Sequence, residues 1–302
     1  MGLPRFDRIE DAVLVTHRSC MDGAGSALLF IRAGGKRENI RYVSAGMLER
    51  FVKTDKVFNS GAFLIFCDIG FNAPEYAARL DRRGNCVLLD HHKTSLHMQG
   101  RPWADIRMDA CGTELLRQYL GLDDLGSSYL AGVIDSHDRW LTTDVHFPLS
   151  TDLACFVSFV GQKDFVNRFA DGRPLLPGLF TPFERDMTNV VIRRRDEQIA
   201  NTMKHVRVRD VDLSGRSFKI GYVVSDDPNT SLLLNRLLET YPDVQAACQV
   251  MVGHAKVSLR SRGDFDVSTI AQLFGGGGHA AASGHLIDDA LIDELISEVH
   301  RG

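Results

Sequence analysis

Histidine and aspartate residues recur in four short clusters in the first half of the sequence, and their types suit metal chemistry. The clusters comprise His17, Asp22, Asp68, Asp90, His91, His92, Asp135, His137 and Asp138. A single aspartate after an apolar run is usually a helix cap or a turn former, but four successive clusters are not explained in this way. If these carboxylates gather in one place, they repel one another unless cations hold them there.

Mixed histidine and aspartate ligands without a set of thiolates favour a hard or borderline divalent ion. We therefore expect Mn²⁺, with Mg²⁺, Co²⁺ and Zn²⁺ as alternatives. The number of candidate ligands is enough for two ions that share a bridging carboxylate. Paired ions of this kind characteristically serve phosphoester hydrolysis, because they stabilise both the attacking and the leaving oxygen.

The apolar runs that precede the clusters predict the elements that position them. Residues 12–16, 63–67 and 86–89 are continuous β-rich runs, and helical stretches such as 74–83 separate them. This pattern is typical of a parallel sheet buried on both faces. We interpret the segment before Asp135 as a fourth strand-like run. Because such sheets bind ligands outside the carboxyl ends of their strands, the clusters should meet at one edge.

The length of 302 residues suggests two domains. We predict an α/β protein with a parallel-sheet N-terminal domain (1–180), a connecting helix (181–205) and a smaller α/β C-terminal domain (206–302). Thr181-Pro182-Phe183-Glu184 is typical of a helix start. Within the C-terminal domain the sequence predicts strands at 218–224 and 250–260 and helices at 231–239 and 268–274.

The composition excludes several classes of protein. Hydrophobic residues make up 44% and charged residues 25%, as in ordinary globular proteins, which argues against disorder. No apolar run approaches the roughly 18 residues of a membrane span, and the N-terminal residues do not resemble a signal peptide. A net charge of −4 argues against a protein that coats long nucleic acid. Six cysteines without a CxxC pair indicate a reduced, cytoplasmic protein.

Four segments resemble, in order, the motifs of the DHH phosphoesterase family, which is named after the triplet Asp90-His91-His92. A fifth segment, at 257–285, resembles the C-terminal domain associated with that family. The chain length and the HDRW form of the fourth motif are most similar to the bacterial branch of short-oligoribonucleases (nanoRNases) and dinucleotide phosphodiesterases. The four motifs are VTHRSCMDGAGSA (15–27), IFCDIG (65–70), LLDHHKTS (88–95) and VIDSHDRW (133–140).

The resemblance implies a role for each residue of these motifs. Asp68 would bridge two ions, His92 would face the phosphate, and Asp90 would orient the neighbouring histidine; these three are the expected catalytic residues. In the fourth motif either Asp138 or Asp135 would be the ligand, and we prefer Asp138. The implied metal ligands are His17, Asp22, Asp68, His91, Asp138 and, as the alternative, Asp135.

One position departs from the family pattern. Many relatives place an additional aspartate between the histidine and the Asp-Gly pair of the first motif, and here Cys20 lies close to that place. We expect Cys20 to be a small buried thiol that binds nothing. One ion would then have fewer ligands than in those relatives.

The C-terminal domain carries the candidate substrate-binding residues. A glycine run lets the backbone approach a ligand, and its successive N–H groups can bind an anion. Arg260 offers a guanidinium fork that suits phosphate, whereas Arg262 is as well explained by a solvated strand position. The candidates are Arg260, Ser261, Arg262, Gly276, Gly277, Gly278 and His279.

The expected function is that of a manganese-dependent phosphodiesterase. It would hydrolyse dinucleotides such as pGpG or pApA, or very short RNA, to mononucleotides. The alternatives are a pAp phosphatase, an exopolyphosphatase and a non-catalytic sensor that binds a nucleotide. We expect a dinucleotide or short RNA as the partner, no long nucleic acid and no membrane, and a homodimer is compatible with this assignment.

Overall fold

A computed structural model describes residues 2–71, 73–170, 175, 178–213 and 215–287. The chain divides into two compact units, Met1–Ile192 and Arg193–Gly302, and the division falls within helix α8 (Pro182–Met203). The predicted helix start is confirmed, because the N–H of Thr181 donates to Glu184 Oε2 at 2.6 Å and the N–H of Glu184 donates to Thr181 Oγ1 at 3.2 Å. Among the described residues, no helix is long and apolar enough to cross a membrane.

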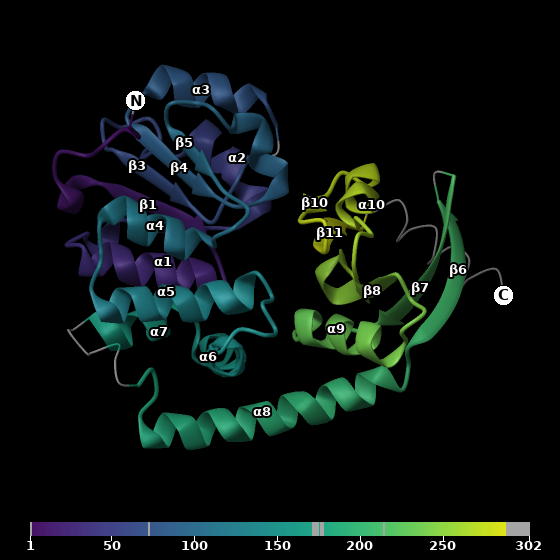
Figure 1. The fold of residues 1–302 in the computed structure, drawn as a ribbon. Coiled ribbons are helices and arrows are strands. Elements are labelled where there is room, and N and C mark those ends of the chain that lie inside the picture. Colours follow the sequence, from purple (N-terminus) through teal and green to yellow (C-terminus); the bar gives the residue numbers. More distant parts are fainter. Residues whose placement is uncertain (1, 72, 171–174, 176–177, 214, 288–302) are drawn as a thin grey trace. The chain divides into compact units, whose positions relative to one another are not determined.

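The first unit is built on the predicted parallel sheet, which confirms the α/β class. Its strand order is β2-β1-β3-β4-β5, and every pair of neighbours is parallel (Figure 1). The two edge strands, β2 and β5, are absent from the sequence-based prediction because both are short and carry no continuous apolar run. The strands are β1 (Val13–His17), β2 (Ile40–Val43), β3 (Leu64–Cys67), β4 (Cys86–Asp90) and β5 (Ala104–Ile106).

Helices cover both faces of this sheet, so its central strands are buried on both sides (Figure 1). Alternate residues of one strand face different cores: Leu14 packs in one and Val15 in the other. The first core includes residues of α1 (Met21–Arg32), α4 (Gly112–Leu120), α5 (Leu125–Asp138), α6 (Phe147–Val160) and α7 (Gln162–Ala170). The second includes residues of α2 (Ala45–Thr54) and α3 (Glu75–Arg83), and short 3-10 helices lie at Ile9–Asp11, Arg37–Asn39 and Lys93–Met98.

The prediction of a strand-like segment before Asp135 is wrong. Val133 and Ile134 belong to α5, which begins after Asp124, whose Oδ1 accepts a hydrogen bond of 3.0 Å from the N–H of Ser127. Both side chains are fully buried with Leu130 in the first core. A short apolar run buried inside a helix looks the same in sequence as a buried strand.

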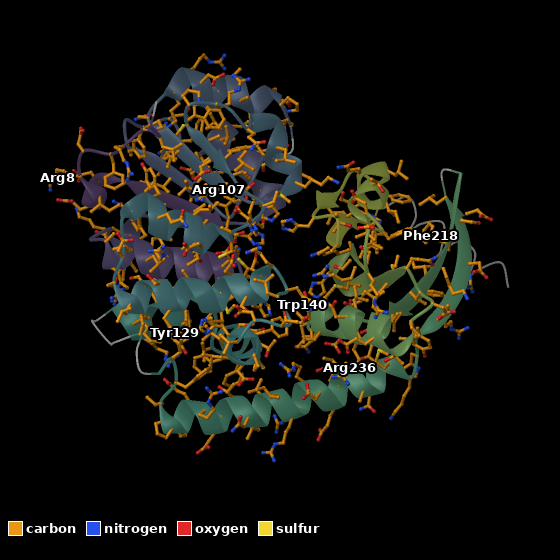
Figure 2. All side chains as sticks on the ribbon, in the orientation of Figure 1. Arg8, Arg107, Tyr129, Trp140, Phe218 and Arg236 are labelled. Carbon is orange, nitrogen blue, oxygen red and sulfur yellow. The ribbon has the colours of Figure 1, made fainter. Side chains whose placement is uncertain are left out.

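The second unit contains a six-stranded sheet of order β10-β11-β9-β8-β7-β6, in which only β7 and β8 are parallel. Phe218 of β7 (Figure 2) packs against Phe265, with ring centroids 4.9 Å apart. The strands are β6 (Arg207–Leu213), β7 (Arg216–Val224), β8 (Ala246–Met251), β9 (Lys256–Ser261), β10 (Gly277–Gly278) and β11 (Ala282–Leu286). The helices are α9 (Thr230–Thr240), α10 (Ser268–Leu273) and a 3-10 turn at Val252–His254.

The single strand predicted at 250–260 is in fact two antiparallel strands, β8 and β9. The 3-10 turn at Val252–His254 separates them, and Ala255 turns the chain with a left-handed φ of 45°. Gly253 is the one turn-forming residue in this segment, and a single glycine within a strand pattern can also mark a bulge, so the apolar residues on both sides look continuous. The other predicted elements of this unit are present: β7, α9 and α10 overlap the expected ranges.

Gly23 allows α1 to approach the end of β1 closely. A Cβ atom at Gly23 would lie 2.1 Å from the carbonyl oxygen of His17, whereas one at Gly132 of α5 would meet no atom closer than 3.7 Å. We expect Gly23→Ala to lower the free energy of unfolding by about 1–3 kcal/mol, since the backbone must shift. Gly132→Ala is the matched control and should be neutral or stabilising by up to about 1 kcal/mol. Denaturant unfolding measures both, and equal stabilities would contradict the close approach.

Candidate metal centre

Three of the four clusters meet at the carboxyl edge of the first sheet, as the strand pattern predicts. His17 is the last residue of β1, Asp68 directly follows β3, and His91 and His92 directly follow β4. These three strands are neighbours in the sheet. The fourth contribution, Asp138, is the last residue of α5 rather than a residue that follows a strand.

Three carboxylates surround one nitrogen of His91. Its Nε2 lies 3.3 Å from Asp138 Oδ2, 3.4 Å from Asp68 Oδ1 and 3.7 Å from Asp22 Oδ2. The side chains of His91, Asp68 and Asp22 are at most 5% exposed, and that of Asp138 is 28% exposed. The four residues therefore form one enclosed group that opens toward solvent at Asp138.

Asp68 belongs to two groups of potential ligands at once. One ligand atom each of Asp22, Asp68 and His91 lies within 4.8 Å of the others, and the same holds for His17, Cys20 and Asp68. Asp68 has a left-handed φ of 54°, and Gly112 packs so closely on it that a Cβ there would lie 2.6 Å from Asp68 Cβ. The backbone thus holds this carboxylate between the two groups.

The start of α4 fixes Asp22. The N–H groups of Gly112 and Thr113 donate to its two carboxylate oxygens at 2.8 and 2.6 Å, and the Thr113 hydroxyl donates to its carbonyl oxygen. N–H groups in the first turn of a helix have no partner within that helix and attract negative charge. The sequence alone does not identify Gly112 or Thr113, because their contact with Asp22 spans about 90 residues and leaves no local pattern.

Asp90 and His92 form a separate pair beside this group. His92 Nδ1 lies 2.7 Å from Asp90 Oδ1, and Asp90 is fully buried. Burial opposes ionisation of Asp90, but His92 holds the pKa of Asp90 below its usual range, and Asp90 in turn raises the pKa of His92. Gly70 of the second motif makes room for this pair, because a Cβ there would lie 2.3 Å from Asp90 Oδ2. The pair fixes the orientation of the His92 ring.

The geometry separates Asp138 from Asp135. Asp135 Oδ1 accepts from the N–H of Cys111 at 2.7 Å, and its Oδ2 pairs with Arg139 at 2.9 Å. His137, between them, packs edge-on against Trp140. Asp138 instead directs its Oδ2 to His91 Nε2, which supports the preference for Asp138 over Asp135.

The pKa shifts in the enclosed group indicate that it has less positive charge than its three carboxylates require. Burial, and after it the carboxylate of Asp22, raises the pKa of Asp68 to about 7. Burial of its carboxylate is the main cause that raises the pKa of Asp138 to about 6, and His91 opposes the rise. Burial disfavours charged His91, but Asp138, Asp68 and Asp22 outweigh it and raise its pKa to about 11. One imidazolium cannot neutralise three carboxylates.

The donor set fits divalent cations. Buried carboxylates are normally paired with cations or coordinate metals, and the described residues around this group supply three carboxylates, two imidazoles and one thiol. Oxygen and nitrogen donors at one sheet edge suit Mn²⁺, Mg²⁺ or Zn²⁺. Asp22, Asp68, His91 and Asp138 would hold one ion, and His17 and Asp68 a second.

Cys20, which the sequence analysis expects to be a small buried thiol, lies beside Asp68 in the structure. It is partly exposed, whereas the other five cysteines are buried. Its Sγ lies 3.1 Å from Asp68 Oδ2 and accepts a hydrogen bond of 3.1 Å from the N–H of Gly23. Both contacts place the sulfur inside the candidate metal centre.

Gln162 is a site residue that sequence reasoning missed. It lies at the start of α7, and its Nε2 donates to the carbonyl oxygens of His17 and Cys20 at 3.0 and 3.4 Å. Its Oε1 accepts from the N–H of Ser19 at 2.9 Å. The Gln162 side chain therefore stabilises the turn between β1 and α1 through three hydrogen bonds. A lone glutamine far along the chain gives no signal of this role in the sequence.

The candidate substrate-binding residues all lie in the second unit. Arg260 of β9 donates to Ser231 Oγ at 2.7 Å and to the carbonyl oxygen of Leu259 at 2.9 Å, which fixes its guanidinium. Ser261 Oγ donates to the carbonyl oxygen of Ala280 at 3.1 Å. The Arg262 guanidinium donates to a carbonyl at the end of α9, so Arg262 is tied to the fold.

The glycine run has a structural role as well as any role in binding. The N–H of Gly276 donates to the carbonyl oxygen of Ala271, and a Cβ at Gly276 would lie 2.1 Å from the carbonyl oxygen of Gly284. Gly277 and Gly278 form β10, which pairs with β11, and the hairpin turns at His279. The run is therefore an edge strand rather than an open loop.

Comparison with known proteins finds a family resemblance in most of the second unit. Residues 221–301 match the model of the DHHA1 domain. The match falls on the segment that resembles the DHH-associated domain in sequence, and it extends beyond the described residues at its C-terminal end.

Relatives of the whole chain confirm the resemblance to DHH-family phosphoesterases. The oligoribonuclease NrnB of Bacillus subtilis (strain 168) is 26% identical over 312 residues, which cover 93% of this chain and 74% of that protein. The pGpG-specific phosphodiesterase PggH from Vibrio cholerae has a similar fold (TM-score 0.52, 13% identity, 96% and 99% covered). So does RecJ from Thermus thermophilus in complex with Mn²⁺ (TM-score 0.56, 16% identity, 96% and 51% covered).

Substitutions in the fourth motif test which aspartate is a ligand. We expect Asp138→Asn to weaken Mn²⁺ binding by about 10- to 100-fold or more, because even residues that only orient a ligand have effects of that size. Asp135→Asn is the matched control; its contacts are to Cys111 and Arg139, so bound manganese should stay near the wild-type level. Calorimetric titration of the metal-free proteins measures both. The opposite ranking would make Asp135 the ligand.

Proposed function

We propose that this protein is a manganese-dependent phosphodiesterase that hydrolyses dinucleotides or very short RNA to mononucleotides. The observation that carries the proposal is the position of Asp68, which belongs to both groups of potential ligands. A carboxylate between two cation sites is the arrangement of enzymes that cleave phosphoesters. The similarity to an oligoribonuclease over 93% of the chain supports the choice of substrate.

The chain's own residues have distinct tasks in this reaction. Divalent ions held at the centre would supply a water nucleophile and stabilise the attacking and leaving oxygens. Asp22 and Asp68 are held rigidly by backbone contacts, so the centre needs little rearrangement to bind cations. Asp90 orients His92, and we assign His92 to the phosphoryl oxygens, where a positively charged donor stabilises developing negative charge.

Two features support a short substrate in a reducing compartment. The net charge of −4 offers no overall attraction for a long polyanion. The structure has no disulfide bond among its six cysteines, all of them described, which is typical of cytoplasmic proteins. Arg260 of the second unit is our candidate for binding the part of the substrate beyond the scissile phosphate.

Product analysis with a substrate panel tests the proposed function. The full-length protein is incubated with Mn²⁺ and pGpG, pApA, a five-nucleotide RNA, pAp or polyphosphate, with Asp68→Ala as the inactive control. We expect mononucleotides from pGpG, pApA or the short RNA, and almost no turnover by Asp68→Ala. Faster release of phosphate from pAp or from polyphosphate would replace the proposal with one of those activities. Tight binding of a nucleotide without turnover would indicate a sensor.

His92 should affect catalysis without affecting metal binding. We expect His92→Ala to lower kcat by about 10²- to 10³-fold, the effect of removing one donor that stabilises charge in the transition state. His97→Ala is the control: His97 is exposed, and its Nδ1 contacts the nearby carbonyl oxygen of Thr94. Metal content is measured alongside kcat. Loss of bound manganese in His92→Ala would make His92 a ligand instead.

Arg260 should affect the binding of the substrate rather than the hydrolysis step. Removing a charge-assisted hydrogen bond costs about 1.5–3 kcal/mol, so Arg260→Ala should lower kcat/KM for a dinucleotide by about 10- to 100-fold. A small activated phosphodiester without a second nucleotide should be cleaved as by wild type. Arg236→Ala is the control, because Arg236 lies exposed on α9 (Figure 2). Equal losses on both substrates would place Arg260 in the chemistry itself.

A further inference from the structure

The turn between β1 and α1 brings a sulfur atom to the metal centre. One ligand atom each of His17, Cys20 and Asp68 lies within 4.8 Å of the others, and all three residues belong to the first unit. The Sγ of Cys20 lies 3.1 Å from Asp68 Oδ2. Asp68 is also the carboxylate that the Asp22–His91 group shares. Cys20 is therefore not an isolated cysteine but the third member of a nitrogen, sulfur and oxygen donor set.

The surroundings of Cys20 suit a thiolate once a cation is bound. The N–H of Gly23 donates to its Sγ at 3.1 Å, and Cys20 is the residue that caps the N-terminus of α1, where negatively charged sulfur is stabilised. Burial and the neighbouring carboxylates raise the pKa of the Cys20 thiol, so a cation must offset them. Gln162 Nε2 and the tight packing of Gly23 on His17 hold the turn in place, which keeps the sulfur beside Asp68.

Cys20 differs from the other five cysteines in the exposure of the residue. Cys67, Cys86, Cys111, Cys155 and Cys248 are buried, whereas Cys20 is partly exposed. A thiol that only fills space gains most from full burial. Cys20 instead directs its sulfur to a buried carboxylate, at the position where an ion shared by His17 and Asp68 would have its third ligand.

We propose that Cys20 binds, as a thiolate, the divalent ion held by His17 and Asp68. The S–H bond breaks, the sulfur lone pair binds the ion and the proton passes to solvent, as for other metal-bound cysteines. The two ions that share Asp68 then differ in chemistry: one has nitrogen, sulfur and oxygen ligands, and the other has only nitrogen and oxygen ligands. Thiolate ligands favour Zn²⁺, Co²⁺ or Fe²⁺ over Mg²⁺, so the two positions would differ in their preference among divalent ions.

Cobalt titration of the full-length metal-free protein tests the proposal, because a thiolate–Co²⁺ bond produces a charge-transfer band in the near ultraviolet. We expect wild type and the control Cys248→Ala, which removes a buried thiol of β8, to show this band at one equivalent of bound cobalt. Cys20→Ser and Cys20→Asp should lack it. Cys20→Asp should still bind two cobalt ions. The ratio of its Zn²⁺ affinity to its Mn²⁺ affinity should be at least about tenfold lower than the same ratio for wild type.

The outcomes separate this proposal from the proposed function on which it rests. A wild-type protein that binds two cobalt ions without the band, or a band that persists in Cys20→Ser, overturns the assignment of Cys20 whatever the enzymatic activity. If the band depends on Cys20 in a protein that cleaves no dinucleotide, that result supports Cys20 as a metal ligand and overturns the proposed function. If no cobalt binds, the metal centre and the assignment of Cys20 both fail. The cobalt spectrum of wild type needs no variant. Its result is therefore valid even if a variant fails to fold.

Discussion

Asp22, Asp68 and Asp138 all approach the same nitrogen of His91, and the repulsion between these carboxylates determines what the surrounding structure must supply. The start of α4 donates two N–H groups to Asp22. A left-handed backbone and the absence of a side chain at Gly112 hold Asp68 in place. Each of these devices fixes a carboxylate before any cation arrives. Bringing these carboxylates together lowers the free energy of unfolding, and the binding of cations would offset that loss.

The sheet and three of its four polar clusters were predictable from sequence because a strand buried on both faces has a strong pattern, and the clusters follow such strands directly. The assignment of Asp138 to a strand end failed because Val133 and Ile134 are buried inside a helix, where a short apolar run has no distinctive period. The role of Gln162 was unpredictable for a different reason. It depends on a contact between residues separated by 145 positions, and such contacts leave no local pattern.

In the second unit, residues that the sequence analysis assigns to substrate binding also stabilise the fold. Gly276 is required because β11 passes too close for any side chain, and Arg262 ties β9 to the end of α9. These roles explain Gly276 and Arg262 without a ligand. Arg260 is held by Ser231, so its guanidinium is already ordered before a substrate binds. An ordered cation loses less entropy on binding a phosphate than a mobile one does.

The residues of the metal centre enter the chain in a fixed order: His17 and Asp22 first, then Asp68 and His91, and Asp138 last. During synthesis, β1, β3 and β4 therefore leave the ribosome before α4 has supplied the N–H groups for Asp22 and before α5 has brought Asp138. A nascent chain that stops short of α5 lacks Asp138, one of the three carboxylates around His91. The three carboxylates around His91 can therefore assemble only after α5 has emerged.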